Sequence, residues 1–225
     1  MTHKYKPRIP ERLLQLTVGF CVILLFNTSS LFAFETKARS AMIVDDLTGT
    51  VLLQKNAQIP IPPASMSKLM TLYMVFDALR TERIHLTDKI RVSEIASQKG
   101  GSRMFLEAGQ LVSIENLIRG IIIHSGNDAC IAIAEALSGT EQEFAKDMNI
   151  AAKFIGLKGS FFTNSTGWPD PRHYMTAEDL IILATKIRRE FPKLYKIFSE
   201  DSFTWNKITQ NNRNPLLGRG LGADG

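Results

Sequence analysis

The sequence predicts an α+β protein in which a short antiparallel hairpin is accompanied by helices. Two short apolar segments, 41–44 and 51–53, are separated by a polar stretch that contains a glycine, which is typical of two strands and their connecting loop. Farther along, five segments are typical of helices in their apolar spacing or end signals. A length of 225 residues with 44% hydrophobic and 22% charged residues is sufficient for a folded core.

Residues 1–33 have the features of a secretory signal peptide. Four basic residues come first, a mainly apolar run follows at 13–26, and small residues at 29–33 favour cleavage after Ala33. The run is shorter than the ~20 residues that cross a bilayer, so a cleaved leader is favoured over a membrane-spanning helix. The mature chain would then begin at residue 34.

Removal of this leader changes the charge of the protein. The complete chain has 27 Lys and Arg against 22 Asp and Glu, and the mature part has 23 against 21, so the net charge falls from +5 to +2. Because no basic run or stripe remains, the sequence argues against a nucleic-acid partner. Cys21 lies in the leader, and we expect Cys130 to be a small buried hydrophobic residue rather than a reactive thiol.

The elements after the hairpin follow from helix breakers and caps. Prolines at 60, 62 and 63 precede a predicted helix at 65–80 that is apolar on nearly every side. The irregular pattern at 91–112 indicates a surface loop that overhangs a site. Further helices are predicted at 114–124 after Ser113, 128–137, 141–155, and from Thr176 to about residue 191.

The predicted strands are too few for these helices. Only 203–205 adds a short strand candidate to the hairpin, and 210–214 is polar. A sheet covered by five helices needs about five strands. We therefore expect the sheet to be incomplete in this chain, with apolar surface and strand edges left exposed.

Two motifs lie at the ends of predicted helices and together indicate an acyl-transfer site. In the first, Ser65 and Lys68 are three residues apart, so a helix places both side chains on one face. A serine nucleophile needs a nearby base, and a lysine serves as one only when burial or a cationic neighbour lowers its pKa. The second motif, Ser125-Gly126-Asn127, adds polar groups, although alone it is more typical of a helix-helix turn.

The two motifs together match the Ser-x-x-Lys and Ser-x-Asn signature of serine penicillin-interacting enzymes. From about residue 38 to 225 the chain resembles the low-molecular-mass D-alanyl-D-alanine carboxypeptidases of the penicillin-binding protein 5 type. The segments that carry this resemblance are Pro63-Ala64-Ser65-Met66-Ser67-Lys68-Leu69-Met70-Thr71, Leu117-Ile118-Arg119-Gly120, His124-Ser125-Gly126-Asn127-Asp128-Ala129-Cys130 and Asn212-Arg213-Asn214.

The resemblance implies a fold of the DD-peptidase and serine β-lactamase type, an antiparallel sheet with a helical subdomain. It implies that Ser65 attacks the bond between the terminal D-alanines of peptidoglycan stem peptides, with Lys68 as the base. Ser125 would relay a proton to the leaving amine, Asn127 would bind the substrate amide, and Arg213 would shape the pocket. It also implies a periplasmic protein with no cofactor or metal, acylated by β-lactam antibiotics.

The chain departs from this family at its C-terminal end. No Lys-Thr-Gly follows Ser125, and the resemblance would place that strand soon after residues 220–225. The C-terminal β domain and the amphipathic anchor that attaches such enzymes to the inner membrane are also missing from the sequence. We therefore expect residues 34–225 to be the N-terminal part of a catalytic domain, inactive as given.

Other functions remain open on the sequence alone. A class A β-lactamase would carry Ser-Asp-Asn and a later glutamate, but 161–166 holds no acid. A peptidoglycan endopeptidase and a non-catalytic binder of stem peptides or of a partner are the main alternatives. A triad built on His124 or His173 is less favoured than solvated or capping roles for these residues. Together with His85, these two histidines also lack the close sequence spacing of zinc ligands in a zinc peptidase, such as His-Glu-x-x-His.

Overall fold

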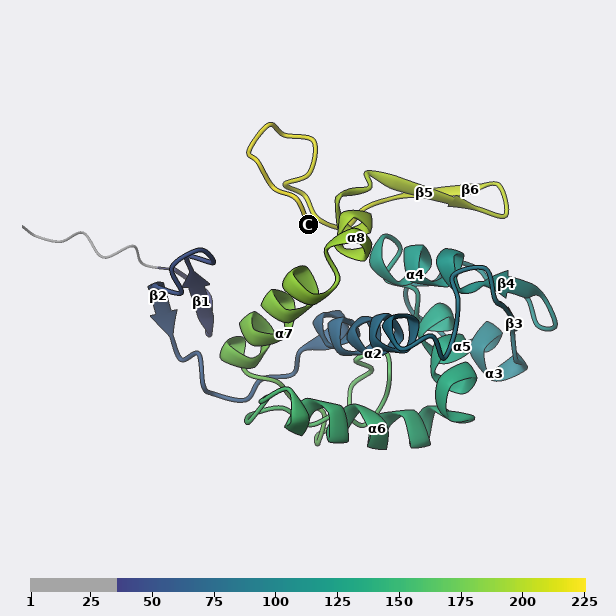
Figure 1. Cartoon of the computed structure of the whole chain (residues 1–225), viewed down its shortest axis with the longest axis horizontal. Coiled ribbons are helices and arrows are strands. Elements are labelled where there is room, and N and C mark those ends of the chain that lie inside the picture. The colour runs from purple at the N-terminus through teal and green to yellow at the C-terminus, as the bar shows by residue number, and fades with distance from the viewer. Residues whose placement is uncertain (1–35) are drawn as a thin grey trace, which may run out of the picture. The chain divides into compact units, whose positions relative to one another are not determined.

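Helix α2 (Lys68–Arg80) lies among the other helices of the fold (Figure 1). A computed structural model describes residues 36–225, so the predicted leader with Cys21 lies outside the described residues. Along α2, every residue before Arg80 is buried or half-buried, as the apolar sequence predicted. The side chains of Met70, Val75 and Phe76 are completely buried. Because it is packed on all sides, this helix holds the residues at its N-terminal end in a defined position.

Four helices pack against α2: α4 (Ile114–Ile122), α5 (Asn127–Ser138), α6 (Glu141–Phe154) and α7 (Ala177–Glu190). Their bounds agree with the predicted ones to within two residues. Predicted caps are present, because the Ser113 hydroxyl accepts from the Asn116 amide and the Thr176 hydroxyl from the Asp179 amide. Short helical turns α8 (Pro192–Tyr195) and η2 (Lys196–Ser199) follow α7.

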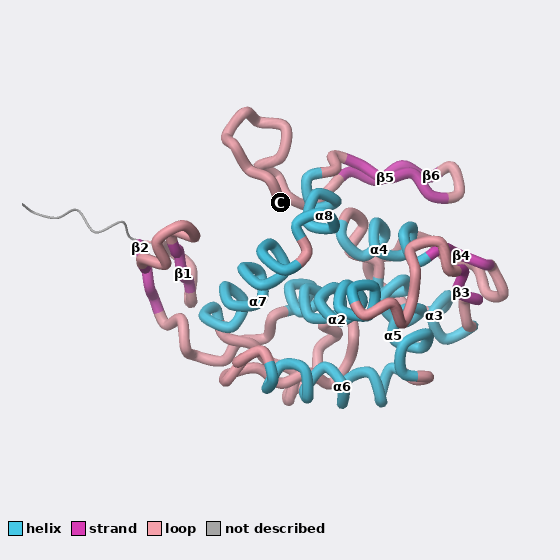
Figure 2. Tube along the Cα trace, viewed as in Figure 1, coloured by secondary structure: helices cyan, strands magenta, loops and turns pink. Residues whose placement is uncertain are grey.

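The strands of the described chain form three separate two-stranded antiparallel sheets, which lie around the helices (Figure 2). They are β1 (Ala41–Val44) with β2 (Val51–Lys55), β3 (Lys89–Arg91) with β4 (Leu111–Ser113), and β5 (Ser202–Trp205) with β6 (Ile208–Asn211).

The first of these pairs is the predicted hairpin, and its surface is partly apolar. Leu52 is 65% exposed, and Ile43 and Val51 are each exposed by nearly half. This agrees with the expectation that apolar surface on the hairpin is left uncovered.

Two irregular segments contain more regular structure than the sequence predicted. The stretch 91–112 includes the ends of β3 and β4 and the short helix α3 (Glu94–Gln98), so only its middle is a loop. Strand β6 occupies part of the polar stretch after 209. The strands of the β3–β4 and β5–β6 pairs are three or four residues long, which is too short for an alternating apolar pattern to be visible in the sequence.

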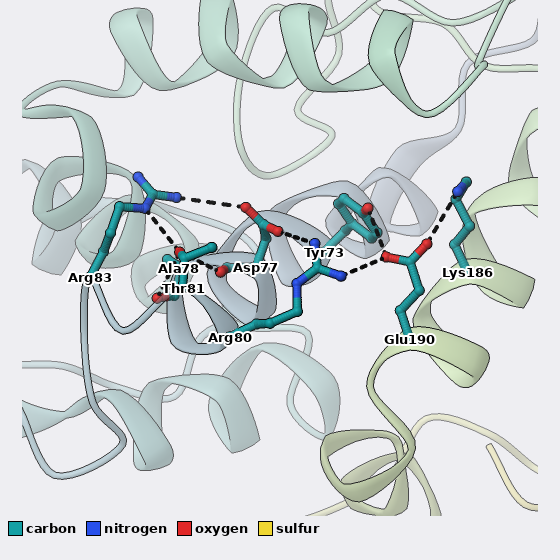
Figure 3. Close-up of polar contacts among 8 residues, drawn as sticks. All are labelled: Tyr73, Asp77, Ala78, Arg80, Thr81, Arg83, Lys186 and Glu190. Atoms are coloured by element: carbon teal, nitrogen blue, oxygen red, sulfur yellow. Dashed lines mark hydrogen bonds and ion pairs between the residues drawn. The ribbon is translucent and has the colours of Figure 1, made fainter.

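The C-terminal ends of α2 and α7 are joined by a polar network (Figure 3). Glu190 accepts a hydrogen bond of 3.0 Å from the Tyr73 hydroxyl and is paired with Arg80 at 3.3 Å and Lys186 at 3.1 Å. Arg80 is also paired with Asp77. The network ties the end of α2 that is farther from Ser65 to its neighbouring helix. None of the helices in the described part is both long and apolar enough to cross a membrane.

Candidate active site

Ser65 lies in a single 3-10 turn, η1 (Ala64–Ser67), and not in the α-helix that the sequence predicted. Pro63 stands before the turn, and Ala64 has a positive φ of 48°, so the chain reaches α2 through a tight bend. In a 3-10 turn, side chains three residues apart eclipse one another. This places the Lys68 ammonium nitrogen Nζ 3.0 Å from Ser65 Oγ.

Lys68 is the first residue of α2, and its side chain is held in the interior. Its exposed fraction is only 4%, and Nζ donates a 2.8 Å hydrogen bond to the carbonyl oxygen of Thr166. Burial lowers the pKa of Lys68, and Arg213 lowers it further, whereas Cys130 opposes the shift. The site therefore favours the neutral amine more than water does, which is the form that accepts a proton.

The second motif lies in the turn between α4 and α5. Ser125 has a positive φ of 57°, a conformation that costs a non-glycine residue about 1–2 kcal/mol. Ser125 lines the same cavity as Ser65 and Lys68, with a volume of about 380 Å³. Asn127 begins α5, where its side-chain amide donates to the Gly100 carbonyl at 2.8 Å. The structure thus brings three predicted residues to one cavity, with Asn127 two residues from Ser125.

The middle of the 91–112 segment forms part of the cavity wall. Ser102 lines the cavity, and its carbonyl accepts from the Asn127 backbone amide at 2.8 Å. Arg213, from the C-terminal segment, also lines it and donates to Ser102 Oγ at 3.2 Å and to the His124 carbonyl at 3.3 Å. Its guanidinium is a fixed positive charge beside the buried lysine. Arg213 therefore lies in the wall of this cavity.

Sequence reasoning missed the loop at 163–168, which forms the floor behind Lys68. Asn164 Oδ1 accepts hydrogen bonds from the backbone amides of Thr166, Gly167 and Trp168, which folds the loop tightly. Gly167 has a φ of +79° and lies so close to the Ala64 carbonyl that a Cβ atom would overlap it. Asn164 and Gly167, three residues apart in a polar stretch, were the available signal, because both residue types favour tight turns.

A family model for D-alanyl-D-alanine carboxypeptidases, peptidase family S11, matches residues 27–225. The chain belongs to this family. Its curated relatives include the D-alanyl-D-alanine carboxypeptidases DacF of Bacillus subtilis, 39% identical over 84% of this chain, and DacC of Escherichia coli, 38% identical over 93%. The matches cover 50% and 56% of those proteins, so the chain spans about half the length of the curated relatives it matches.

The solved structures agree with this membership of the carboxypeptidase family. Penicillin binding protein 5 from Haemophilus influenzae has a TM-score of 0.81 to this chain at 39% identity, covering 84% of this chain and 56% of the other. The predicted α+β fold of the DD-peptidase type is therefore confirmed. Of this fold, the described chain contains the helices around α2 and the small antiparallel sheets.

Two histidines of this carboxypeptidase family member are not solvated, which was one of the two roles expected for them, although His173 Nδ1 accepts from the Thr163 backbone amide at 3.2 Å. His124 is completely buried and its ring lies against Phe203, while His173 is 3% exposed and lies against Phe162. Burial lowers the pKa of both. Phe203 belongs to the distant strand β5, and Phe162 is brought to His173 by the bridge between Phe161 and Tyr174, so the residues next to each histidine did not reveal its burial.

Cys130 has the role that the sequence predicted. It is completely buried in α5, and burial raises the pKa of its thiol to about 12. A thiol with such a pKa is protonated at neutral pH and is a poor nucleophile. Within residues 36–225, no three His, Cys, Asp or Glu side chains come together in a group that could hold a metal ion.

Proposed function

We propose that the protein containing this chain is a serine-type D-alanyl-D-alanine carboxypeptidase that removes the terminal D-alanine from peptidoglycan stem pentapeptides. The observation that carries this proposal is the 3.0 Å contact between Ser65 Oγ and Lys68 Nζ, made by a lysine that is only 4% exposed. A buried amine within hydrogen-bond reach of a serine hydroxyl is the arrangement that activates the serine as a nucleophile.

In the proposed reaction, Lys68 takes the Ser65 proton as Oγ attacks the carbonyl between the two D-alanines. A bond forms between Oγ and this carbon, and the amide bond to the last D-alanine breaks. Ser125, on the same cavity, relays the proton to the departing amine, and Asn127 binds an amide of the substrate. Water then hydrolyses the ester and restores the Ser65 hydroxyl, with Lys68 again moving the proton.

The same site would react with β-lactams, whose ring amide replaces the scissile peptide bond. The name of the Haemophilus influenzae neighbour, a penicillin binding protein, supports this proposal. Opening of the ring leaves the β-lactam attached to Ser65 as an ester. No cofactor is needed, because the nucleophile, the base and the proton relay are all side chains of this chain.

We further propose that residues 1–33 direct export and that residues 34–225 belong to the catalytic domain. Peptidoglycan lies outside the cytoplasmic membrane, so a carboxypeptidase of this kind must act there. The basic start and the apolar run of the leader support export, and with the bacterial relatives they favour the periplasm.

The test is labelling of the full-length gene product with a fluorescent penicillin, together with release of D-alanine from a stem pentapeptide. We expect both reactions in the natural protein and neither in Ser65→Ala. Ser67→Ala is the matched control, because Ser67 lies in the same turn and its hydroxyl donates to the Ala64 carbonyl. Labelling of Ser65→Ala, or no D-alanine release by a folded natural protein, would contradict the proposal. Cleavage of cross-linked muropeptides instead would indicate an endopeptidase.

A further inference from the structure

We propose that Glu141, at the start of α6, is a positioning residue that holds Lys68 in place through the backbone of residues 165 and 166. This inference rests on the proposed role of Lys68 as the base. Glu141 does not line the cavity that contains Ser65. It acts through the loop at 163–168, which supplies the carbonyl group that Lys68 contacts.

Ser165 is held on three sides by residues from two helices. Glu141 Oε1 accepts hydrogen bonds from the Ser165 backbone amide at 3.0 Å and from its hydroxyl at 2.7 Å. On the other side, Thr71 Oγ1 donates to the Ser165 carbonyl at 2.7 Å. Ser165 is completely buried, so water does not replace these partners. Among the three contacts of Ser165, the two with Glu141 involve a carboxylate, and such hydrogen bonds are the stronger kind.

The next residue, Thr166, carries the carbonyl that Lys68 Nζ contacts at 2.8 Å. The amide of Thr166 donates to Asn164 Oδ1 at 3.1 Å. The Thr166 carbonyl itself belongs to the next peptide unit, whose N–H, that of Gly167, donates to the same Asn164 Oδ1 at 2.8 Å. With Ser165 held by Glu141 and both peptide units tied to Asn164, the backbone at Thr166 has little freedom to turn. The direction of the Thr166 carbonyl, and with it the position of Nζ, therefore depends on Glu141 as well as on Asn164.

The position of Nζ matters because of the bonding of a neutral amine. A neutral lysine has two N–H groups and one lone pair. When the Thr166 carbonyl accepts one N–H, rotation about the last side-chain bond is restricted, and the lone pair can face Ser65 Oγ at 3.0 Å. If the carbonyl turned away, Nζ would lose this orientation and water would reach it.

The charged and titratable groups that act on Lys68 come from other parts of the fold. Cys130 faces it from α5 and Arg213 from the C-terminal segment, while Glu141 acts on Cys130. Burial is the largest cause of the lowered pKa of Lys68. Entry of water after loss of the Glu141 contacts would raise this pKa toward its ordinary value. The neutral form would then appear only at higher pH, and acylation would need a higher pH as well.

The experiment measures the rate of acylation by a fluorescent penicillin from about pH 6 to about pH 10 in the full-length gene product. For Glu141→Ala we expect the rise of the rate with pH to move up by about one unit, which makes acylation about tenfold slower at neutral pH. Glu141→Gln keeps an oxygen that accepts from Ser165, so it should retain most of the acylation rate of the natural protein. Glu143→Ala is the matched control, because Glu143 lies in the same first turn and its carboxylate pairs with exposed Lys146. We expect no change there.

A second readout is the titration of the Lys68 side chain by NMR, which does not depend on catalysis. The Lys68 pKa should rise in Glu141→Ala and in Thr71→Val, which removes the other contact of Ser165. If the natural protein is folded but not acylated, the proposed function fails, and the titration still decides this inference. A pH profile and a Lys68 pKa in Glu141→Ala that equal those of Glu143→Ala would overturn it.

Discussion

Gly167→Ala is the substitution for which the structure predicts the largest effect from one added methyl group. The backbone of Gly167 has a φ of +79°, which costs an alanine about 1–2 kcal/mol. The new Cβ would also overlap the Ala64 carbonyl and lie 2.6 Å from Ser67 Oγ, and overpacking of this kind costs about 1–3 kcal/mol. Together, the free energy of unfolding should fall by about 2–5 kcal/mol.

Gly156→Ala separates the two causes. Gly156 has a similar φ of +89°, but a Cβ there would meet no atom within 4 Å. We therefore expect only the backbone cost, about 1–2 kcal/mol. Urea unfolding followed by tryptophan fluorescence measures both variants under the same conditions.

The substitution at Gly167 should also slow acylation, since relief of the overlap moves Ala64 and the neighbouring Ser65. A displacement of about 1 Å at a reacting group costs up to about 10² in rate. We expect Gly167→Ala to be labelled by a fluorescent penicillin at least about tenfold more slowly than Gly156→Ala, at a temperature where both are folded. Equal stability losses in the two variants, with equal labelling rates, would refute the reasoning.

Three further substitutions test other parts of the fold. Asp128→Asn should lower the free energy of unfolding, measured in urea, by about 2–4 kcal/mol, because three backbone amides donate to this buried carboxylate. A loss of stability no larger than that caused by a substitution of an exposed residue would contradict this prediction. The pKa of Tyr73 is raised to about 12 by burial and by its hydrogen bond to Glu190. The stabilising effect of the protonated Tyr73 hydroxyl should be complete below about pH 10 and be lost between about pH 10 and 12. Across that range, the free energy of unfolding of the natural protein should therefore fall by roughly 2 kcal/mol more than that of Tyr73→Phe. Cys130→Ala should leave acylation unchanged, whereas a rate loss as large as that of Ser65→Ala would show that the thiol takes part.

The elements that the sequence predicted correctly are those with local signals. The hairpin was visible from its polar loop, and α7 from the cap at Thr176. The two motifs placed Ser65, Lys68 and Ser125, which line one cavity in the structure. The deciding contacts of the hairpin loop, the cap and the Ser65–Lys68 pair lie within a few residues in the sequence or in one helical turn, whereas Ser125, 60 residues after Ser65, was assigned to the same site through the family resemblance.

What the sequence did not reveal depends on contacts between distant segments. Ser165 is held by Thr71, 94 residues before it, and no periodic pattern marks the loop in which it lies. The 3-10 turn at Ser65 depends on the close approach of Gly167 to Ala64. The burial of His124 depends on Phe203, which belongs to β5. Such pairings appear only when the helices are packed together.

The 2.8 Å contact between Lys68 and the Thr166 carbonyl joins residues that are 98 positions apart in the chain. During synthesis, Ser65 and Lys68 leave the ribosome long before the segment that completes their surroundings. Contacts of such long range form late, because the entropy of closing the intervening chain must be overcome first. The rate at which a refolding sample becomes able to react with a fluorescent penicillin would therefore report the docking of residues 163–168, a late event that a helix signal would not detect.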